Sequence, residues 1–417
     1  MGLLRFPLVS FATFFLPLLF PHDSAAANPE ILYSFSAGDG YPLGVIAGSP
    51  GVLYGTTCNG GTSDSGLVYS LTAPQGGSGS PWTKSVLYSF MGASDGACPN
   101  TLALGAGGVL YGTTAVDNQT TSLTAFSLTP PQSAGNPWTF TLLFTFTEDE
   151  GSAIGLATGP DGVLYITTRF GGTGGVGSVM SLTPPSAPSG PWTMTVLHTF
   201  VFTEYGAYLD SGVIVGPGGE LYGTAQNGGI TGCPVCGIVY ELFPPTSPGG
   251  NWPFKILYSM TPEASFPVGV AMGKGGVLYG VADEGGRACP DCASVFSLTP
   301  PATPGGAWIE TIFYTFSEGD FNNSFYPLTI GPGGVLYGTA NVPGVSQTCC
   351  GIVYSLTPPA TGSSGGWTET TMHDFAGAPS DGSQPNSALI FGKGGILFGT
   401  TGTGGTYNLG TVYGLKP

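Results

Sequence analysis

The stretch Gly51-Val-Leu-Tyr-Gly-Thr-Thr57 occurs seven times in this chain with small changes. The other copies are GVLYGTT at 108–114, GVLYITT at 162–168, GELYGTA at 219–225, GVLYGVA at 276–282, GVLYGTA at 334–340 and GILFGTT at 395–401. A period of 54 to 61 residues between the aromatic positions indicates stacked or radially arranged units, none of which can bury its apolar face alone. The repeat therefore predicts one repeat domain.

Each repeat contains four short segments with the alternation of β-strands. In the first repeat these are residues 41–47, 52–57, 67–71 and 82–90, with turn residues between them. The third segment is usually followed by Thr-Pro-Pro, and proline ends a strand because it cannot extend the hydrogen-bonded ladder. Each repeat is thus predicted to be a four-stranded antiparallel meander, with strands a to d in chain order.

The ends of the chain predict a closed ring. The last repeat has strand a at 387–391, b at 396–401 and c at 411–415, but no strand d follows. An unattached ILYSF at 31–35 precedes the first repeat and matches the end of strand d in other repeats. Pairing the first strand with the last leaves only short edges, whereas a linear solenoid needs caps at both ends. We predict an all-β, seven-bladed β-propeller of four-stranded antiparallel blades.

The motif resembles the secreted bacterial tandem repeats called GloVer repeats, whose units read GxLYGTT, a glycine-rich loop, VFxLTP and a strand of LYSF type. The resemblance covers 31–415, with departures at Ile166, at Phe398 and at three alanines, Ala225, Ala282 and Ala340. It implies export and a propeller-like fold. It implies no chemistry for any particular residue.

The N-terminal segment, residues 1–27, has the features of a secretory signal peptide. Arg5 precedes an apolar stretch, and Ala25-Ala-Ala27 offers a cleavage site. An uncleaved anchor is the alternative, although the stretch is shorter than the ~20 residues of a membrane span. We predict a secreted protein, extracellular or periplasmic, with a single domain at 28–417 and no membrane span in the mature chain.

The net charge of −16, with only eight Lys and Arg, argues against nucleic acid and anionic membranes as partners, since both require basic patches. Most carboxylates fall in the d–a and b–c loops, which share one face of such a propeller. The binding candidates on this acidic face are Asp39, Asp95, Glu148, Asp149, Glu150, Asp210, Glu263, Asp320 and Asp381. They suit a polyhydroxylated ligand such as a glycan, or a hard cation; alternatively, they only keep the protein soluble.

No D-x-D-x-D-G loop is present, so we assign no metal ligands and expect no cofactor, with calcium as the alternative. The eight cysteines are candidates for disulfides in an exported chain. Cys58 and Cys98 lie in adjacent loops and can pair; Cys233 with Cys236, Cys289 with Cys292, and Cys349 with Cys350 are local pairs. The two C-x-x-C pairs also have the spacing of a zinc site, but oxidation favours disulfides.

Signatures of nucleophilic catalysis are sparse. The mature chain holds only His198 and His373, both in place of the LYSF tyrosine, so we expect them to pack rather than act as bases. All six tryptophans begin a strand d, which indicates packing as well. Paired carboxylates could still cleave glycans, and Glu148-Asp-Glu150 is the densest cluster.

Three functions remain open from the sequence. The first is an exported, non-enzymatic binding propeller whose acidic face engages a glycan or another extracellular partner such as a protein. The second is a glycoside hydrolase or lyase that uses two carboxylates of that face. The third is a structural envelope or matrix protein, which the near-uniform repeats favour. The ligand and the oligomeric state are not predicted.

Overall fold

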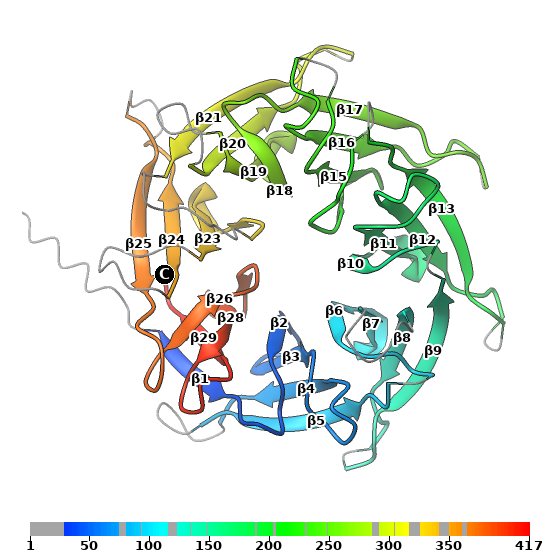
Figure 1. The fold of residues 1–417 in the computed structure, drawn as a ribbon, viewed down its shortest axis with the longest axis vertical. Helices are drawn as coiled ribbons and strands as arrows, with labels where there is room; N and C mark the ends of the chain where they lie inside the picture. Colours follow the sequence, from blue (N-terminus) through cyan, green and yellow to red (C-terminus); the bar gives the residue numbers. More distant parts are fainter. Residues whose placement is uncertain are drawn as a thin grey trace, which may run out of the picture.

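The computed structural model describes residues 29–74, 81–92, 94–115, 123–133, 135–147, 149–187, 190–202, 206–229, 232–247, 249–285, 292–303, 305–316, 326–341, 350–360 and 365–417. The proposed signal peptide lies outside these residues. The chain forms seven antiparallel sheets arranged as blades around a central axis (Figure 1). The predicted seven-bladed propeller is confirmed. No helix in the described ranges is long and apolar enough to cross a membrane.

Each blade has its first strand nearest the axis and its fourth strand on the outside, as Figure 1 shows for β2 and β5. The first three blades consist of β2 (Pro42–Ala47), β3 (Val52–Thr57), β4 (Leu67–Thr72) and β5 (Thr83–Ser89); β6 (Pro99–Leu104), β7 (Leu110–Thr114), β8 (Leu123–Thr129) and β9 (Thr139–Phe146); and β10 (Ala153–Thr158), β11 (Leu164–Thr168), β12 (Ser178–Thr183) and β13 (Thr193–Thr199).

The next three blades follow the same order, with shorter inner strands in the fourth and sixth. They consist of β14 (Ile214–Val215), β15 (Leu221–Ala225), β16 (Ile238–Leu242) and β17 (Phe254–Ser259); β18 (Ser265–Met272), β19 (Leu278–Glu284), β20 (Ser294–Thr299) and β21 (Ile309–Thr315); and β22 (Thr329–Ile330), β23 (Leu336–Ala340), β24 (Ile352–Thr357) and β25 (Thr368–Asp374).

The seventh blade closes the ring with both ends of the chain. It contains β26 (Gly382–Pro385), β27 (Ile390–Phe391), β28 (Leu397–Gly404) and β29 (Thr411–Leu415), and its outer strand is β1 (Glu30–Ser34), which pairs antiparallel with β29. The predicted closure by the N-terminal strand is therefore confirmed. Of the predicted strand at 387–391, only Ile390–Phe391 forms a strand, β27, and the inner strand of this blade begins earlier, at β26, with an interruption from 386 to 389 between the two.

Short 3-10 turns join the two inner strands in four blades: η1 (Ala106–Gly108), η2 (Pro160–Gly162), η3 (Lys274–Gly276) and η4 (Pro332–Gly334). The middle residue takes a left-handed backbone, with φ of 68° at Gly107 and 56° at Asp161. Glycine adopts this conformation without steric cost. The GxxG pattern before each copy of the motif, GxGG in five of the seven, is thus a turn signal.

The glycine of the YGTT motif makes room for an aromatic ring. A Cβ on Gly55 would lie 2.3 Å from the hydroxyl oxygen of Tyr69 on the neighbouring strand. The third blade departs from the motif at two paired positions, since Ile166 faces Met180 across the ladder and both are fully buried. The loss of the ring on one strand is compensated by the gain of a side chain on the other.

The core is divided into apolar clusters between neighbouring blades. The Trp138 ring of the second blade meets the Tyr54 ring of the first edge-on, with centroids 5.8 Å apart. The same contact joins Tyr111 to Trp192, Tyr165 to Trp252 and Tyr279 to Trp367. The prediction that the tryptophans pack is confirmed for these blades, and edge-to-face geometry is the preferred arrangement for aromatic pairs.

Candidate functional site

Four acidic residues of the d–a loops hold their own loops closed. In four blades a carboxylate accepts the N–H of the residue that follows the strand-d phenylalanine. The pairs are Asp39 with Ser36, Asp95 with Met91, Glu150 with Thr147, and Asp381 with Ala376. A carboxylate with a backbone donor in place is satisfied by its loop. Ligand binding by these four stays a prediction.

Three of these carboxylates also contact strand d. Asp39 accepts from the Tyr33 hydroxyl and pairs with Lys84, whereas Asp95, only 7% exposed, accepts from Tyr88. Burial disfavours the charged form of Asp39, but hydrogen bonds from Lys84 and Ser36 outweigh it and lower its pKa. Asp381 shows the same balance, with His373 Nε2 2.8 Å away lowering its pKa.

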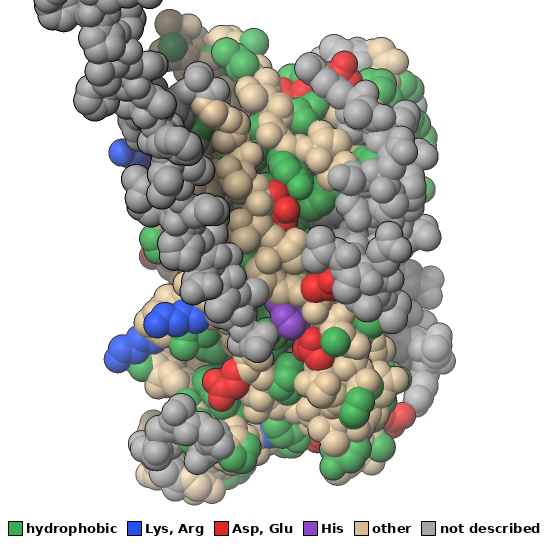
Figure 2. All heavy atoms as spheres, turned by 90° about the vertical axis from the view of Figure 1, so that its left-hand side faces the viewer, with side chains coloured by type: hydrophobic (Ala, Val, Ile, Leu, Met, Phe, Trp, Pro, Cys, Tyr) green, Lys and Arg blue, Asp and Glu red, His purple; other side chains and the backbone are tan. Residues whose placement is uncertain are grey.

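The structure describes three of the remaining acidic candidates. Asp149 and Glu263 are exposed in separate blades, and Glu148 and Asp320 lie outside the described residues. On the side of the ring where β25 lies, Figure 2 shows Asp and Glu side chains as scattered patches among polar and apolar atoms. Asp210 differs from all of them, because it lies in the segment that leads into the inner strand β14 and lines the centre of the ring.

The inner strands carry a polar position where they approach the axis. In the second blade the Asn100 amide donates to the main-chain oxygen of Ala153 at 2.7 Å, and its oxygen accepts from Thr113 Oγ1 at 2.9 Å. In the seventh blade Asn386 makes the same two bonds, to Pro42 O and from Thr400 Oγ1, each 2.7 Å long. Each asparagine therefore ties its blade to the next one.

Asp210 occupies this position in the fourth blade. The residues two positions earlier, Cys98, Tyr208 and Gln384, share a left-handed backbone with φ of 51°, 57° and 58°. The main-chain oxygens of Cys98 and Tyr208 also accept from matching residues of strand b, Ala115 and Gln226. This shared backbone places Asp210 at the position of Asn100 and Asn386. Among these three blades, the fourth has an acid where the second and the seventh have asparagine.

The acid changes the polar contacts around it. Asp210 pairs with Arg169 of the third blade instead of bonding within its own blade. Thr224 Oγ1, the counterpart of Thr113 and Thr400, is buried without a hydrogen-bond partner, and so is Ser211 Oγ. Burial raises the pKa of Asp210, and the Arg169 guanidinium offsets this only in part. The fourth blade thus holds a buried charge beside two unsatisfied hydroxyls.

Asp210 and Ser211 face a cavity of about 370 Å³ at the centre of the ring. Its wall combines hydrogen-bonding and apolar side chains from six blades. They include Leu43, Thr56, Asn100, Ile154, Asp210, Ser211, Tyr326, Asn386 and Ser387. A concave site with a few polar groups on an apolar wall is the usual form of a small-molecule site.

The family follows from the repeat. Residues 18–233 and 105–302 match the Gloeobacter/Verrucomicrobia repeat. This chain belongs to that repeat family. The resemblance predicted from the GxLYGTT motif is therefore confirmed. No curated protein matches the sequence of this Gloeobacter/Verrucomicrobia repeat protein.

Two solved structures share the fold of the Gloeobacter/Verrucomicrobia repeat protein. The extracellular domain of a one-component system from B. thetaiotaomicron aligns with a TM-score of 0.54 at 10% identity, covering 92% of this chain and 39% of that one. The β-propeller domain of Cps50 from Myceliophteria thermophila aligns with a TM-score of 0.53 at 9% identity, covering 93% and 100%. This chain thus spans well under half the length of the first, and both likenesses concern the fold alone.

Disulfides brace loops of the Gloeobacter/Verrucomicrobia repeat protein. Cys58–Cys98 joins the first two blades, and Cys233–Cys236 closes a local loop. Cys292 is also disulfide-bonded. Both predicted pairs in the described ranges are confirmed, and a zinc site is wrong for Cys233 and Cys236 because their sulfurs are joined to each other. Cys350 is buried, while Cys289 and Cys349 lie outside the described residues.

In the parts of the chain that the structure describes, no three His, Cys, Asp or Glu side chains gather as a group that could hold a metal ion. His198 stacks on Phe254 with ring centroids 3.9 Å apart, as predicted for a packing residue, and burial lowers its pKa to about 4. Sequence reasoning placed Asp210 among the candidates but missed Arg169, Ser211 and the two asparagines. Aligning PNT at 99–101 and PNS at 385–387 with LDS at 209–211 would have found them.

Proposed function

We propose that this protein is exported and binds a polyhydroxylated ligand, such as a glycan, in the central cavity, with Asp210, which pairs with Arg169, as its charged contact. One observation carries the proposal: the fourth blade has Asp210, paired with Arg169 of the third blade, and two unsatisfied hydroxyls where two other blades have a fully bonded asparagine. Buried polar groups without partners are rare in folded proteins. The position of Asp210 and Ser211 on the cavity wall supports a binding role.

The chemistry of the wall suits hydroxyl groups. The Asp210 carboxylate accepts hydrogen bonds, so it can hold ligand hydroxyls that donate them. The Ser211 hydroxyl retains donor and acceptor capacity, and Leu43 and Tyr326 supply apolar surface for the carbon face of a sugar. Such a ligand would satisfy the groups that folding leaves unpaired.

The disulfides support export. Disulfides persist in oxidising compartments and are rare in the cytosol, and this chain has Cys58–Cys98 and Cys233–Cys236 formed. Together with the apolar segment at 1–27, they favour a secreted protein whose mature domain begins near residue 28. Mass spectrometry of the exported protein would read the cleavage site directly; a mature chain that still begins at Met1 would contradict this part of the proposal.

The test is a glycan-array screen of residues 28–417 under oxidising conditions, followed by calorimetry on the best ligand. We expect Asp210→Asn to weaken binding by about 10- to 100-fold, because a charge-assisted hydrogen bond contributes about 1.5–3 kcal/mol. Asp149→Asn is the matched control, since it removes the same charge from an exposed loop and should leave affinity unchanged.

Four results would redirect the assignment. Equal affinity of wild type and Asp210→Asn would overturn the cavity site. Release of reducing ends during incubation would favour the hydrolase or lyase. A calcium requirement, together with loss of binding in Asp149→Asn, would move the site to the acidic loops. Absence of binding to any glycan would overturn the ligand class.

A further inference from the structure

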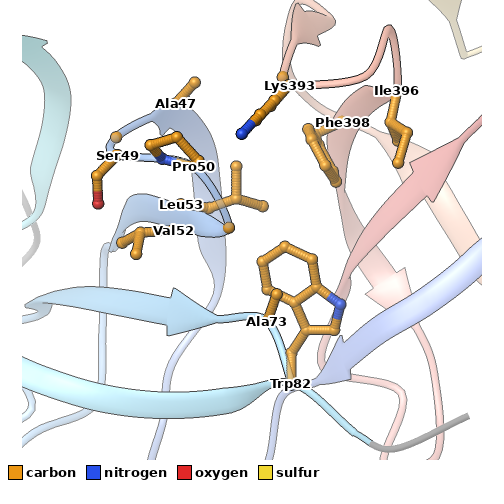
Figure 3. A pocket seen from close by; sticks show the side chains of 13 residues that line it. Ala47, Ser49, Pro50, Val52, Leu53, Ala73, Trp82, Lys393, Ile396 and Phe398 are labelled. Carbon is orange, nitrogen blue, oxygen red and sulfur yellow. The ribbon is translucent and has the colours of Figure 1, made fainter. Parts of the chain in front are cut away.

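A second cavity lies between the seventh and first blades, where the ring closes. Its volume is about 310 Å³, and it opens beside the turn between β2 and β3. Figure 3 shows Leu53 and Val52 on one wall, Trp82 and Ala73 at its base, and Phe398 and Ile396 opposite. Because this turn is at the end of β2 away from Asp39, the cavity is at the opposite face from the acidic loops.

A departure from the repeat enlarges this cavity. In five other blades, proline occupies the position two residues after the last leucine of strand c. Its Cγ lies 3.6 to 4.0 Å from the place that a Cβ would take on the glycine of the turn before strand b. These prolines are Pro130, Pro184, Pro244, Pro300 and Pro358. The first blade has Ala73 instead, beside Gly51. The space that the proline ring carbons fill in the other blades is part of the cavity in the first blade.

A second departure removes a polar group from the wall. The aromatic residue of the repeat motif is tyrosine in six copies and phenylalanine only at Phe398. Phe398 meets Trp82 edge-on with ring centroids 5.9 Å apart. No tyrosine hydroxyl therefore enters this wall. The two departures coincide at one blade interface, and together they form an aromatic slot.

One cation stands at the mouth of the slot. Lys393 belongs to the turn between β27 and β28 and is exposed, and its amino group points over the cavity in Figure 3. None of the described carboxylates forms a salt bridge with it. An ammonium at the rim of an apolar slot, on a chain of net charge −16, is a local site for an anionic group.

We propose that this slot binds an amphipathic carboxylate, with an aromatic or short acyl group between Trp82 and Phe398 and the carboxylate on Lys393. The apolar group gains by leaving water, while the charged group remains at the solvent boundary where its desolvation is small. The site is independent of the proposed glycan cavity, because the two share no lining residue.

Calorimetry with 4-phenylbutyrate, and with its neutral amide as comparison, tests the proposal on residues 28–417. We expect saturable binding of the carboxylate with a Kd below about 1 mM, as the size of the probe allows. Lys393→Gln should reduce the preference for the carboxylate over the amide by about two- to fivefold, the range of an exposed ion pair.

Filling the slot is the decisive variant. Ala73→Pro restores the residue of the other blades but removes the N–H that donates to Gly51 O at 2.8 Å. Ala73→Val keeps this hydrogen bond and also fills the space, so both variants should weaken binding at least about tenfold with an unchanged circular dichroism spectrum. Undiminished binding in Ala73→Val, or no binding to the wild type, overturns the proposal. Asp210→Asn should leave this affinity unchanged.

Discussion

The side-chain amide of Asn386 donates to the main-chain oxygen of Pro42, 344 residues earlier in the chain, at 2.7 Å. The bond joins the inner strand of the last blade to that of the first, so it reinforces the closure made by β1 and β29 at the outside of the ring. Asn100 makes the equivalent bond between the second and third blades. Side-chain amides thus link blades near the axis, where the strands converge.

Replacing Asn386 with leucine, the residue found at the equivalent position of the first blade, should destabilise the protein. The variant leaves Pro42 O and Thr400 Oγ1 without their partner, and an unsatisfied buried group costs about 1–3 kcal/mol. Urea denaturation followed by circular dichroism measures the change. Asn100→Leu should cost a similar amount; a loss confined to Asn386→Leu would show that ring closure, and not the hydrogen bonds, sets the effect.

Replacing Asp210 with asparagine should stabilise the protein near neutral pH while it weakens ligand binding. The new amide can donate across to the fifth blade, as Asn100 and Asn386 do to their neighbours, and a typical net hydrogen bond contributes about 1 kcal/mol. A site whose natural residue lowers stability is expected where function requires it. Thermal unfolding of both proteins without ligand checks the sign.

The pH dependence gives a second readout for Asp210. Its pKa is raised in the folded state, so between the ordinary carboxyl pKa and this raised value the folded protein binds more protons than the unfolded one. The wild type therefore loses stability as pH rises through this window, and the advantage of Asp210→Asn should grow until Asp210 is ionised in both states. An advantage independent of pH from 3 to 8 would mean that the ionisation of Asp210 has no energetic cost.

His198→Tyr should remove an acid sensitivity. Burial lowers the pKa of His198 to about 4, below its unfolded value, so the folded state binds fewer protons and stability falls as pH drops from 6.5 towards 4. Tyrosine is the residue of the LYSF motif, and the Tyr88–Phe140 stack shows that it fits against a ring. At pH 5 the variant should gain about 2 kcal/mol relative to its difference at pH 7.5; parallel stability curves would contradict this.

The pairing of Ile166 with Met180 predicts a coupled pair of substitutions. Ile166→Gly alone leaves a cavity and should cost about 3–5 kcal/mol, while Met180→Phe alone overpacks against Ile166 and should cost about 1–3 kcal/mol. The double variant restores the glycine and phenylalanine found at Gly112 and Phe126. Its loss of stability should be smaller than the sum of the two single losses by more than about 1 kcal/mol. Additive losses would contradict compensation across the ladder.

Much of the fold was accessible from the sequence because its determinants are local and repeated. The seven copies of the GVLYGTT motif, the six tryptophans and the unattached ILYSF at 31–35 set the number of blades and the closure, and each acts through strand alternation or turn geometry within a few residues. Two disulfides followed from loops that the topology brings together. The break in the inner strand at Asn386 was not predicted, because it depends on Pro42 and Thr400.

The roles of the acidic residues were decided only by the tertiary structure. Asp95 and Asp210 are the same residue type in equivalent stretches of the repeat, yet Asp95 accepts donors from its own loop and strand, while Asp210 faces the cavity and pairs with another blade. Whether a carboxylate closes a loop or forms a site depends on its burial and on donors from distant segments. Neither quantity is encoded in the local pattern, because both arise where strands far apart in the sequence meet at the axis.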